Sequence, residues 1–203
     1  MSDHILTTEE YSGTYKYIGG FACIDFINTL SWIGTNREFD WVQSPTLFYQ
    51  WICSSPISKE VAIKDLKKLL NQSTSVDNEL DKVRAIRESI RNVLSPIAHQ
   101  ESIKKKQMAS FNKLVESASA YKNIDEKSLQ WQWKKFNHLY QYTYPLIDET
   151  TILLTSRDHS RLKYCSACGW IFYDTTKNKA RKWCDMSDCG SRAKSLNYYH
   201  KNK

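Results

Sequence analysis

The stretch "CSACGWIFYDTTKNKARKWCDMSDCG", residues 165–190, contains four of the six cysteines of this 203-residue chain. Cys165 and Cys168 form a C-x2-C pair, fifteen residues follow, and Cys184 and Cys189 form a C-x4-C pair. Two short turns of this kind can direct four thiolates at one tetrahedral ion, with each sulfur about 2.3 Å from the metal. The spacing therefore predicts one Zn2+ per chain. Four thiolates leave no open position for a catalytic water, so we expect the metal to be structural.

A redox pair, disulfides and metal-free packing are weaker interpretations of the cysteine cluster. A thioredoxin-like redox pair needs a βαβ context, which the surrounding sequence does not predict. Disulfides need an oxidising compartment, and residues 1–30 show no signal peptide. Four buried cysteines without a metal would be an unusual clustering. The remaining two cysteines, Cys23 and Cys53, stand apart in apolar surroundings and are expected to act as small apolar side chains.

The residues around the four cysteines predict a small module. Residues 169–176 and 177–183 predict a β-hairpin around a Thr-Lys-Asn turn. Residues 191–200, which follow Gly190, predict a helix, and we expect its first turn to carry the fourth ligand, Cys189. We call the turn with Cys165 and Cys168 the first knuckle and the turn with Cys184 and Cys189 the second knuckle. The first knuckle, the hairpin, the second knuckle and the helix together resemble a treble-clef zinc finger.

The chain before this module is predicted to be mostly helical. Ser44 and Pro45 are a helix start signal. Apolar residues at helical spacing predict helices over residues 44–53, 58–70, 76–99, 104–121 and 137–156, the last interrupted near Pro145. Alternation of Leu129, Trp131 and Trp133 with polar residues predicts a half-buried strand in a short hairpin.

We therefore expect a mostly α fold with two parts. Residues 155–160 resemble a linker, so the predicted parts are a helical domain over residues 1–157, which includes the small β-hairpin, and a zinc finger over residues 158–203. No stretch approaches the roughly 18 to 20 apolar residues of a membrane span. These observations predict a cytoplasmic protein with no membrane partner.

The net charge of +7 lies entirely in the zinc-finger region. Residues 161–203 hold ten Lys and Arg against three Asp, whereas residues 1–160 are neutral. A basic segment on a neutral body predicts an acidic partner, with DNA as the leading candidate. The candidate contacts are Lys177, Lys179, Arg181, Lys182, Arg192 and Lys194.

Each of these residues could have a different role. The lysines could be solvated surface residues, and Arg192 could bind backbone carbonyls or pair with Asp185 or Asp188. RNA or single strands are alternatives to duplex DNA, because basic charge with aromatic residues also suits base stacking. The aromatic residues concerned could equally form the core of the finger; they are Trp170, Phe172, Tyr198 and Tyr199.

Several of these stretches resemble two known families. "CSACGW" and "RKWCDMSDCGSRAK" resemble the CGNR zinc finger, with Ser191 where that family has Asn. "GGFACIDFINTL", residues 19–30, resembles the opening motif of the ABATE domain, and "VRAIRESI", residues 83–90, resembles its arginine-bearing helix. The resemblance implies a bacterial, stress-related transcription regulator whose ABATE domain senses a ligand.

The amino-terminal motif places polar residues among apolar ones. Asp25 and Asn28 stand three apart and would be neighbours on a helix. They are either satisfied by internal hydrogen bonds, or they line a pocket for a small polar ligand with Arg84 or Arg87. Either arginine could pair with Asp25 or with a ligand anion.

Two functions of different classes follow. The first is a DNA-binding regulator with a helical sensing part, expected to be a homodimer because one finger offers little surface. The second is a small-molecule-binding protein or an enzyme in which the finger is a structural or protein-docking module. No nucleophile–base pair occurs at a recognisable spacing and the histidines are scattered, so we expect no enzymatic activity.

Overall fold

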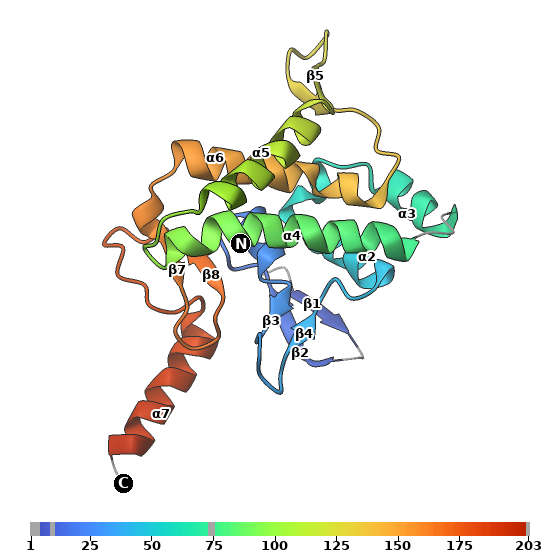
Figure 1. Cartoon of the computed structure of the whole chain (residues 1–203). Helices are drawn as coiled ribbons and strands as arrows, with labels where there is room; N and C mark the ends of the chain where they lie inside the picture. Colours follow the sequence, from blue (N-terminus) through green and yellow to red (C-terminus); the bar gives the residue numbers. More distant parts are fainter. Residues whose placement is uncertain (1–4, 9–10, 73–75, 202–203) are drawn as a thin grey trace.

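Helices predominate in the computed structural model, which describes residues 5–8, 11–72 and 76–201 (Figure 1). The α-helices are α1 (Ala22–Ile27), α2 (Pro45–Ser54), α3 (Ile63–Gln72), α4 (Val76–Ala98), α5 (Lys105–Ser119), α6 (Tyr144–Ser156) and α7 (Ser191–Lys201). Shorter helical turns are η1 (Pro56–Lys59), η2 (Leu139–Thr143), η3 (His159–Arg161) and η4 (Met186–Gly190). The predicted mostly α fold with a carboxy-terminal zinc-finger module is confirmed.

The strands form two-stranded antiparallel hairpins. They pair β1 (Ile5–Thr8) with β2 (Tyr11–Lys16), β3 (Leu30–Ser31) with β4 (Phe39–Asp40), β5 (Lys122–Ile124) with β6 (Trp131–Trp133), and β7 (Leu162–Tyr164) with β8 (Ile171–Tyr173). The sequence predicted β5–β6 correctly as a hairpin. The first two hairpins were not predicted; β3 and β4 have only two residues each, too few to show a strand period.

Helix α4 is the central element of the helical region (Figure 1). It packs against α5, η2, α1 and the finger strand β7. The apolar residues that the sequence places along one face of α4 are the ones buried in the structure, so the predicted helical period matches the observed burial. Six of the seven predicted residues are buried and Ile97 is half-buried; the six are Leu80, Val83, Ile86, Ile90, Val93 and Leu94.

Two local predictions differ from the structure and a third is confirmed. The helix expected from residue 58 begins at Ile63, because the chain first forms the η1 turn. The interruption predicted near Pro145 is present: η2 ends at Thr143, and α6 begins at Tyr144 with Pro145 in its first turn, where a missing N–H costs nothing. Trp131 and Leu129 are 65% and 74% exposed, so the half-buried face expected for β6 is wrong at these residues. The β5–β6 hairpin projects from the body (Figure 1).

The short helix α1 joins the helical region to the finger. All six of its residues are buried, and it contacts α4, α6 and β8. Leu162 and Ile171 of the finger strands belong to the same hydrophobic core as α1 and α4. The segment predicted as a linker is largely structured, since α6 continues to Ser156 and η3 begins at His159.

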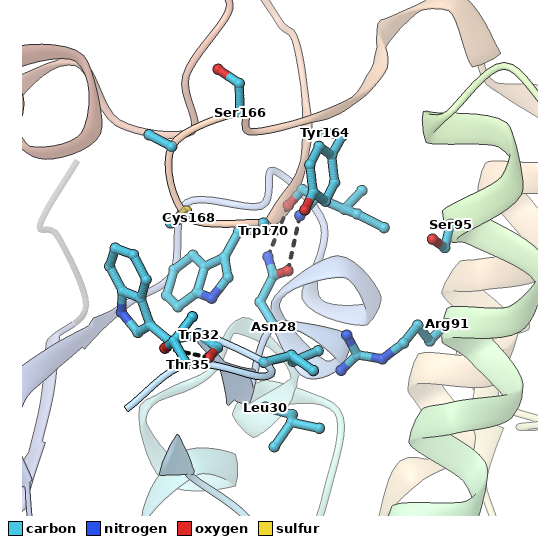
Figure 2. Close-up of a pocket in the computed structure, with 14 residues that line it drawn as sticks. Asn28, Leu30, Trp32, Thr35, Arg91, Ser95, Tyr164, Ser166, Cys168 and Trp170 are labelled. Atoms are coloured by element: carbon cyan, nitrogen blue, oxygen red, sulfur yellow. Dashed lines mark hydrogen bonds between the residues drawn. The ribbon is translucent and has the colours of Figure 1, made fainter. Parts of the chain in front are cut away.

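The amino-terminal motif binds the backbone of β8 at both of its ends. Asn28, the residue that ends α1, donates from Nδ2 to the Ile171 carbonyl at 2.8 Å and accepts from the Ile171 N–H at 3.0 Å (Figure 2). The Gly19 carbonyl accepts from the Tyr173 N–H at 2.7 Å. Gly20 has φ +88°, and a Cβ there would meet Tyr173 Cβ at 3.3 Å. A glycine at position 20 therefore allows both the backbone turn and the close approach of β8.

Replacing Asn28 by Ala should destabilise the protein strongly. The change leaves the Ile171 N–H and C=O without partners at a buried site, at a cost of about 2–4 kcal/mol in the free energy of unfolding. Urea denaturation of the zinc-loaded protein measures this cost. The matched control is Asn112→Ala at an exposed position of α5, which should change stability by less than about 0.5 kcal/mol. Equal effects of the two changes would contradict the role of Asn28.

Candidate metal centre and nucleic-acid interface

The first cysteine pair lies in the turn of the β7–β8 hairpin. The Cys165 N–H donates to the Trp170 carbonyl at 2.8 Å, and the Gly169 N–H donates to the Cys165 carbonyl at 2.9 Å. Gly169 has φ +81°, a conformation that L side chains rarely adopt. The hairpin predicted around the Thr-Lys-Asn turn is therefore wrong: its strands flank Cys165 and Cys168 instead, and residues 177–183 form a loop.

Asp174, directly after β8, holds that loop. Its side chain is fully buried and accepts hydrogen bonds from the Lys163 ammonium, the Thr176 N–H and the Arg181 N–H, each at 2.9 Å. Burial alone would raise the pKa of Asp174, but the hydrogen bonds from Thr176, Lys163 and Arg181 outweigh it and hold the pKa well below its usual range. These hydrogen bonds to Asp174 hold residues 174–181 as a loop, where two paired strands had been expected.

The second cysteine pair is built around the π-helical turn η4: Cys184 lies two residues before it and Cys189 lies within it. Asp185 begins this turn: its carboxylate accepts from the Ser187 N–H at 2.8 Å, and its carbonyl accepts from the Gly190 N–H at 2.9 Å. Lys16 of β2 pairs with the same carboxylate at 2.8 Å. Cys189 therefore lies in η4, just before α7, and not in the first turn of the helix as expected.

The four sulfurs meet at one point. Their Sγ atoms all lie within 4.8 Å of one another, with 3.5 Å between those of Cys168 and Cys184 and 3.7 Å between those of Cys184 and Cys189. Four sulfurs about 2.3 Å from a tetrahedral zinc would stand about 3.8 Å apart, so the arrangement fits this ion. Cys165, Cys184 and Cys189 are buried and Cys168 is half-buried. The cluster is a structural zinc site whose four positions are all taken by cysteine.

Three of the six predicted nucleic-acid contacts have partners within the protein: Lys179, Arg181 and, described below, Arg192. Lys179 pairs with Asp158 at 2.6 Å. Arg181 donates to the carbonyls of Trp183 and Cys184 and lies over the Phe172 ring. Arg181 therefore holds the backbone of the residues that lead into the second knuckle.

Arg192 has partners on both sides of the interface between the finger and the helical region. It pairs with Asp188, one turn back, and its guanidinium carbon lies 4.8 Å from the centre of the Trp32 ring. Of the two roles predicted for Arg192, the structure shows the internal contact. Its neighbour Ser191, which replaces the family's Asn, donates to the Met186 carbonyl at 3.2 Å.

The other three predicted contacts point outward. Lys177 and Lys182 lie in the loop that Asp174 holds, and Lys194 lies on α7; all three are exposed. They form no ion pair or hydrogen bond with any residue that the structure describes. Helix α7 projects away from the body, so Lys194 is reachable by a large partner (Figure 1).

The predicted ligand-pocket residues do not line one common pocket: Arg84 and Arg87 share Asp40 as an ion-pair partner, and Asp25 and Asn28 have other partners. Asp25 is buried, its Oδ1 accepts from the Gly19 N–H at 2.7 Å, and burial raises its pKa well above the usual range. Arg87 holds both carboxylate oxygens of Asp40 and does not reach Asp25. Arg84 donates to the Val42 and Gln43 carbonyls. Asn28 lines a cavity beside the first cysteine pair, and its amide is engaged by Ile171.

Three residues that join the helical region to the finger or line the cavity beside it were not predicted from the sequence: Lys16, Trp32 and Arg91. Lys16 and Trp32 contact Asp185 and Arg192 of the finger across more than 150 residues of sequence, and no local pattern announces such contacts. Arg91 follows Arg87 by one helical turn and donates to the Ile27 carbonyl. Its spacing from Arg84 and Arg87 is the signal that could have found it.

Among the described helices, none is long and apolar enough to cross a membrane.

Comparison with protein families matches nearly the whole chain. The model of the ABATE family, described as "Putative stress-induced transcription regulator", matches residues 20–142, and the model of the CGNR zinc finger matches residues 161–202. A comparison with curated proteins gives no match. The chain belongs to the ABATE family and carries a CGNR zinc finger at its carboxy-terminal end. The predicted family membership is confirmed.

The zinc site can be tested by metal content. The wild-type protein should hold one zinc per chain, and Cys184→Ser should lose it, because three thiolates and a hydroxyl hold Zn2+ less well than four thiolates. Elemental analysis of the purified proteins gives the ratio. Cys53→Ser removes a thiol outside the cluster and should keep one zinc. Full zinc content in Cys184→Ser would contradict the assignment.

Replacing Asp174 by Asn tests how the finger loop is held. The change keeps the shape of the side chain but removes the charge facing Lys163, so we expect a loss of about 2–4 kcal/mol in the free energy of unfolding. Denaturation of the zinc-loaded protein at neutral pH measures it. Asp81→Asn breaks an exposed ion pair with Arg84 and should cost less than about 1 kcal/mol. A loss no larger in Asp174→Asn than in this control would show that the buried carboxylate is dispensable.

Proposed function

We propose that the protein is a DNA-binding transcription regulator in which α7 and the loop over residues 177–182 contact the DNA and the helical region responds to a small ligand. The observation that carries the proposal is the projection of α7 from the body, within the segment that holds the entire net charge (Figure 1). A free α-helix of this kind can enter the major groove of DNA. The family description of a transcription regulator supports the same function.

The chemistry of the exposed residues supports contact with phosphates. Lys177, Lys182 and Lys194 have no intramolecular partner among the described residues, so their charges are available. Phosphate contacts of this kind supply affinity and register, whereas base recognition needs side chains on the helix. Helix α7 offers exposed Ser195, Tyr198 and Tyr199 for that purpose.

The docking of the finger supports ligand control. Asn28 and Gly19 bind the backbone of β8, and Lys16 binds Asp185 beside the second knuckle. A change in the position of α1 or β2 would therefore shift the hairpin and η4, to which α7 is attached. Ligand binding in the helical region could alter DNA affinity through this rigid connection. We also propose that the protein is not an enzyme, because cysteine fills all four positions of the metal site.

RNA or single-stranded binding is the second candidate. The exposed Tyr198 and Tyr199 favour it, because aromatic rings stack on unpaired bases. Titration of the zinc-loaded protein with duplex DNA, duplex RNA and single strands separates the candidates. The regulator proposal requires tightest binding to duplex DNA.

Removing the three exposed lysines should weaken DNA binding and flatten its salt dependence. For the triple variant Lys177→Ala, Lys182→Ala, Lys194→Ala, we expect the slope of log K against log salt to fall by up to about 3, because about one counterion is released per phosphate contact. Fluorescence anisotropy with random duplex DNA over a range of salt concentrations measures the slope.

The matched control removes the same charge from the helical region. Lys105→Ala, Lys106→Ala, Lys127→Ala replaces three exposed lysines outside the finger and should leave the slope nearly unchanged. Equal slopes for the two triple variants would place DNA binding elsewhere, and no binding of the wild type at low salt would refute DNA binding altogether.

A further inference from the structure

A cavity of about 510 Å3 lies between the helical region and the first zinc knuckle. Helix α4 contributes Arg91 and Ser95 to one side, and the knuckle contributes residues 166–169 to the other (Figure 2). The segment around β3 contributes Leu30 and Trp32. The cavity is therefore built from both family regions, and any occupant would touch both.

The charge on this lining comes from one residue. Arg91 is the only Lys, Arg, Asp or Glu among the lining residues, so the cavity contains a cation and no carboxylate. Figure 2 shows the Arg91 side chain extending from α4 toward the centre of the cavity. Glu88, the ion-pair partner of Arg91, lies outside the lining, so the lining itself favours an anion as occupant.

The guanidinium of Arg91 is only partly engaged. Its Nη2 donates to the Ile27 carbonyl, which fixes the direction of the side chain. Its Nε lies 3.3 Å from Glu88 Oε2 without hydrogen-bond geometry and is buried with no hydrogen-bond partner. Its Nη1 has no hydrogen-bond partner among the described residues. Burial lowers the pKa of Arg91, which is the effect of a partly desolvated cation.

The remaining lining suits a molecule with an apolar body. Leu30, Trp32, Ile33 and Trp170 supply apolar surface. The Ser95 hydroxyl forms no hydrogen bond with any described residue and can donate to an anion beside Arg91. Asn28 is occupied by Ile171 and adds no further polar recognition.

The negative charge of the zinc site restricts where an anion can lie. Four thiolates around Zn2+ carry about two negative charges, and Cys168 belongs to the lining. Figure 2 shows Cys168 on the side of the cavity opposite Arg91 and Ser95. The anionic group of an occupant is therefore favoured near α4, and its apolar body would extend toward Trp170 and the knuckle.

We propose that this cavity binds a small organic anion, a carboxylate or phosphate on an apolar or aromatic body, with Arg91 and Ser95 holding the anionic group. Bound there, the molecule joins α4 to the first knuckle and favours the docked position of the finger. The regulatory consequence rests on the proposed function in DNA binding, whereas the binding of the anion does not. This site replaces the pocket predicted around Asp25 and Arg87.

Calorimetric titration of the zinc-loaded full-length protein without DNA tests the binding. The probes are benzoate, phenyl phosphate and the neutral benzamide, with inorganic phosphate as an anion that lacks the apolar body. We expect benzoate or phenyl phosphate to bind in the millimolar range or tighter, and benzamide and inorganic phosphate to bind at least about tenfold more weakly. The stronger of the first two identifies the anionic group.

Two variants assign the binding to this cavity. Arg91→Gln removes the charge and should weaken the preferred probe at least about tenfold. Ser95→Phe keeps Arg91 but fills the cavity, so it should abolish binding even if Arg91→Gln fails to fold. The controls are Arg157→Gln and Ser110→Phe, exposed positions outside the lining, and both should bind as the wild type does.

The outcomes separate this inference from the proposed function. No binding of either anion, equal binding of benzamide, or unchanged binding in Ser95→Phe would overturn the anion site and leave DNA binding intact. Anion binding in a protein that binds no nucleic acid would keep the site and overturn the regulator. If both hold, addition of the preferred probe should change the DNA affinity of the wild type and not that of Ser95→Phe.

Discussion

The structure depends on the pairing of one side-chain amide, that of Asn28, with the backbone N–H and C=O of one residue, Ile171. Asn28 uses its amide oxygen and nitrogen to pair with the N–H and C=O of Ile171, as a neighbouring strand would. Both groups are buried, so each hydrogen bond lacks competition from water. Gly19 adds a third bond to the same strand, two residues further on. The motif that opens the ABATE region thus recognises the backbone of the finger.

This arrangement explains why polar residues stand in a fully buried helix. Asp25 satisfies the Gly19 N–H, and Asn28 satisfies β8, so both residues of the motif act within the protein. Arg87 likewise satisfies Asp40 and Thr29. The large majority of buried polar groups in folded proteins have hydrogen-bond partners. The helical region and the finger consequently share one core, in which Leu162 and Ile171 pack with α1 and α4.

The finger divides its positive charge between two roles. Lys163, Lys179 and Arg181 hold the loop and the second knuckle through Asp174, Asp158 and backbone carbonyls. Lys177, Lys182 and Lys194 remain on the surface. Zinc supplies the stability that so small a module cannot obtain from apolar burial alone. The docking of the module onto α1 then leaves α7 as the projecting element (Figure 1).

The sequence by itself determined the metal site, the central helix and the family. Cysteine spacing and helical period are local properties, so the ligands Cys165, Cys168, Cys184 and Cys189 and the bounds of α4 could be predicted closely. Only the tertiary structure decided which charges face inward: Arg181 and Lys182 are adjacent in sequence, yet Arg181 is held by backbone carbonyls and Lys182 is exposed. It also placed Asn28 against Ile171, 143 residues away, and put Arg91 beside the zinc knuckle. Such long-range contacts depend on how the elements pack, and no local pattern encodes them.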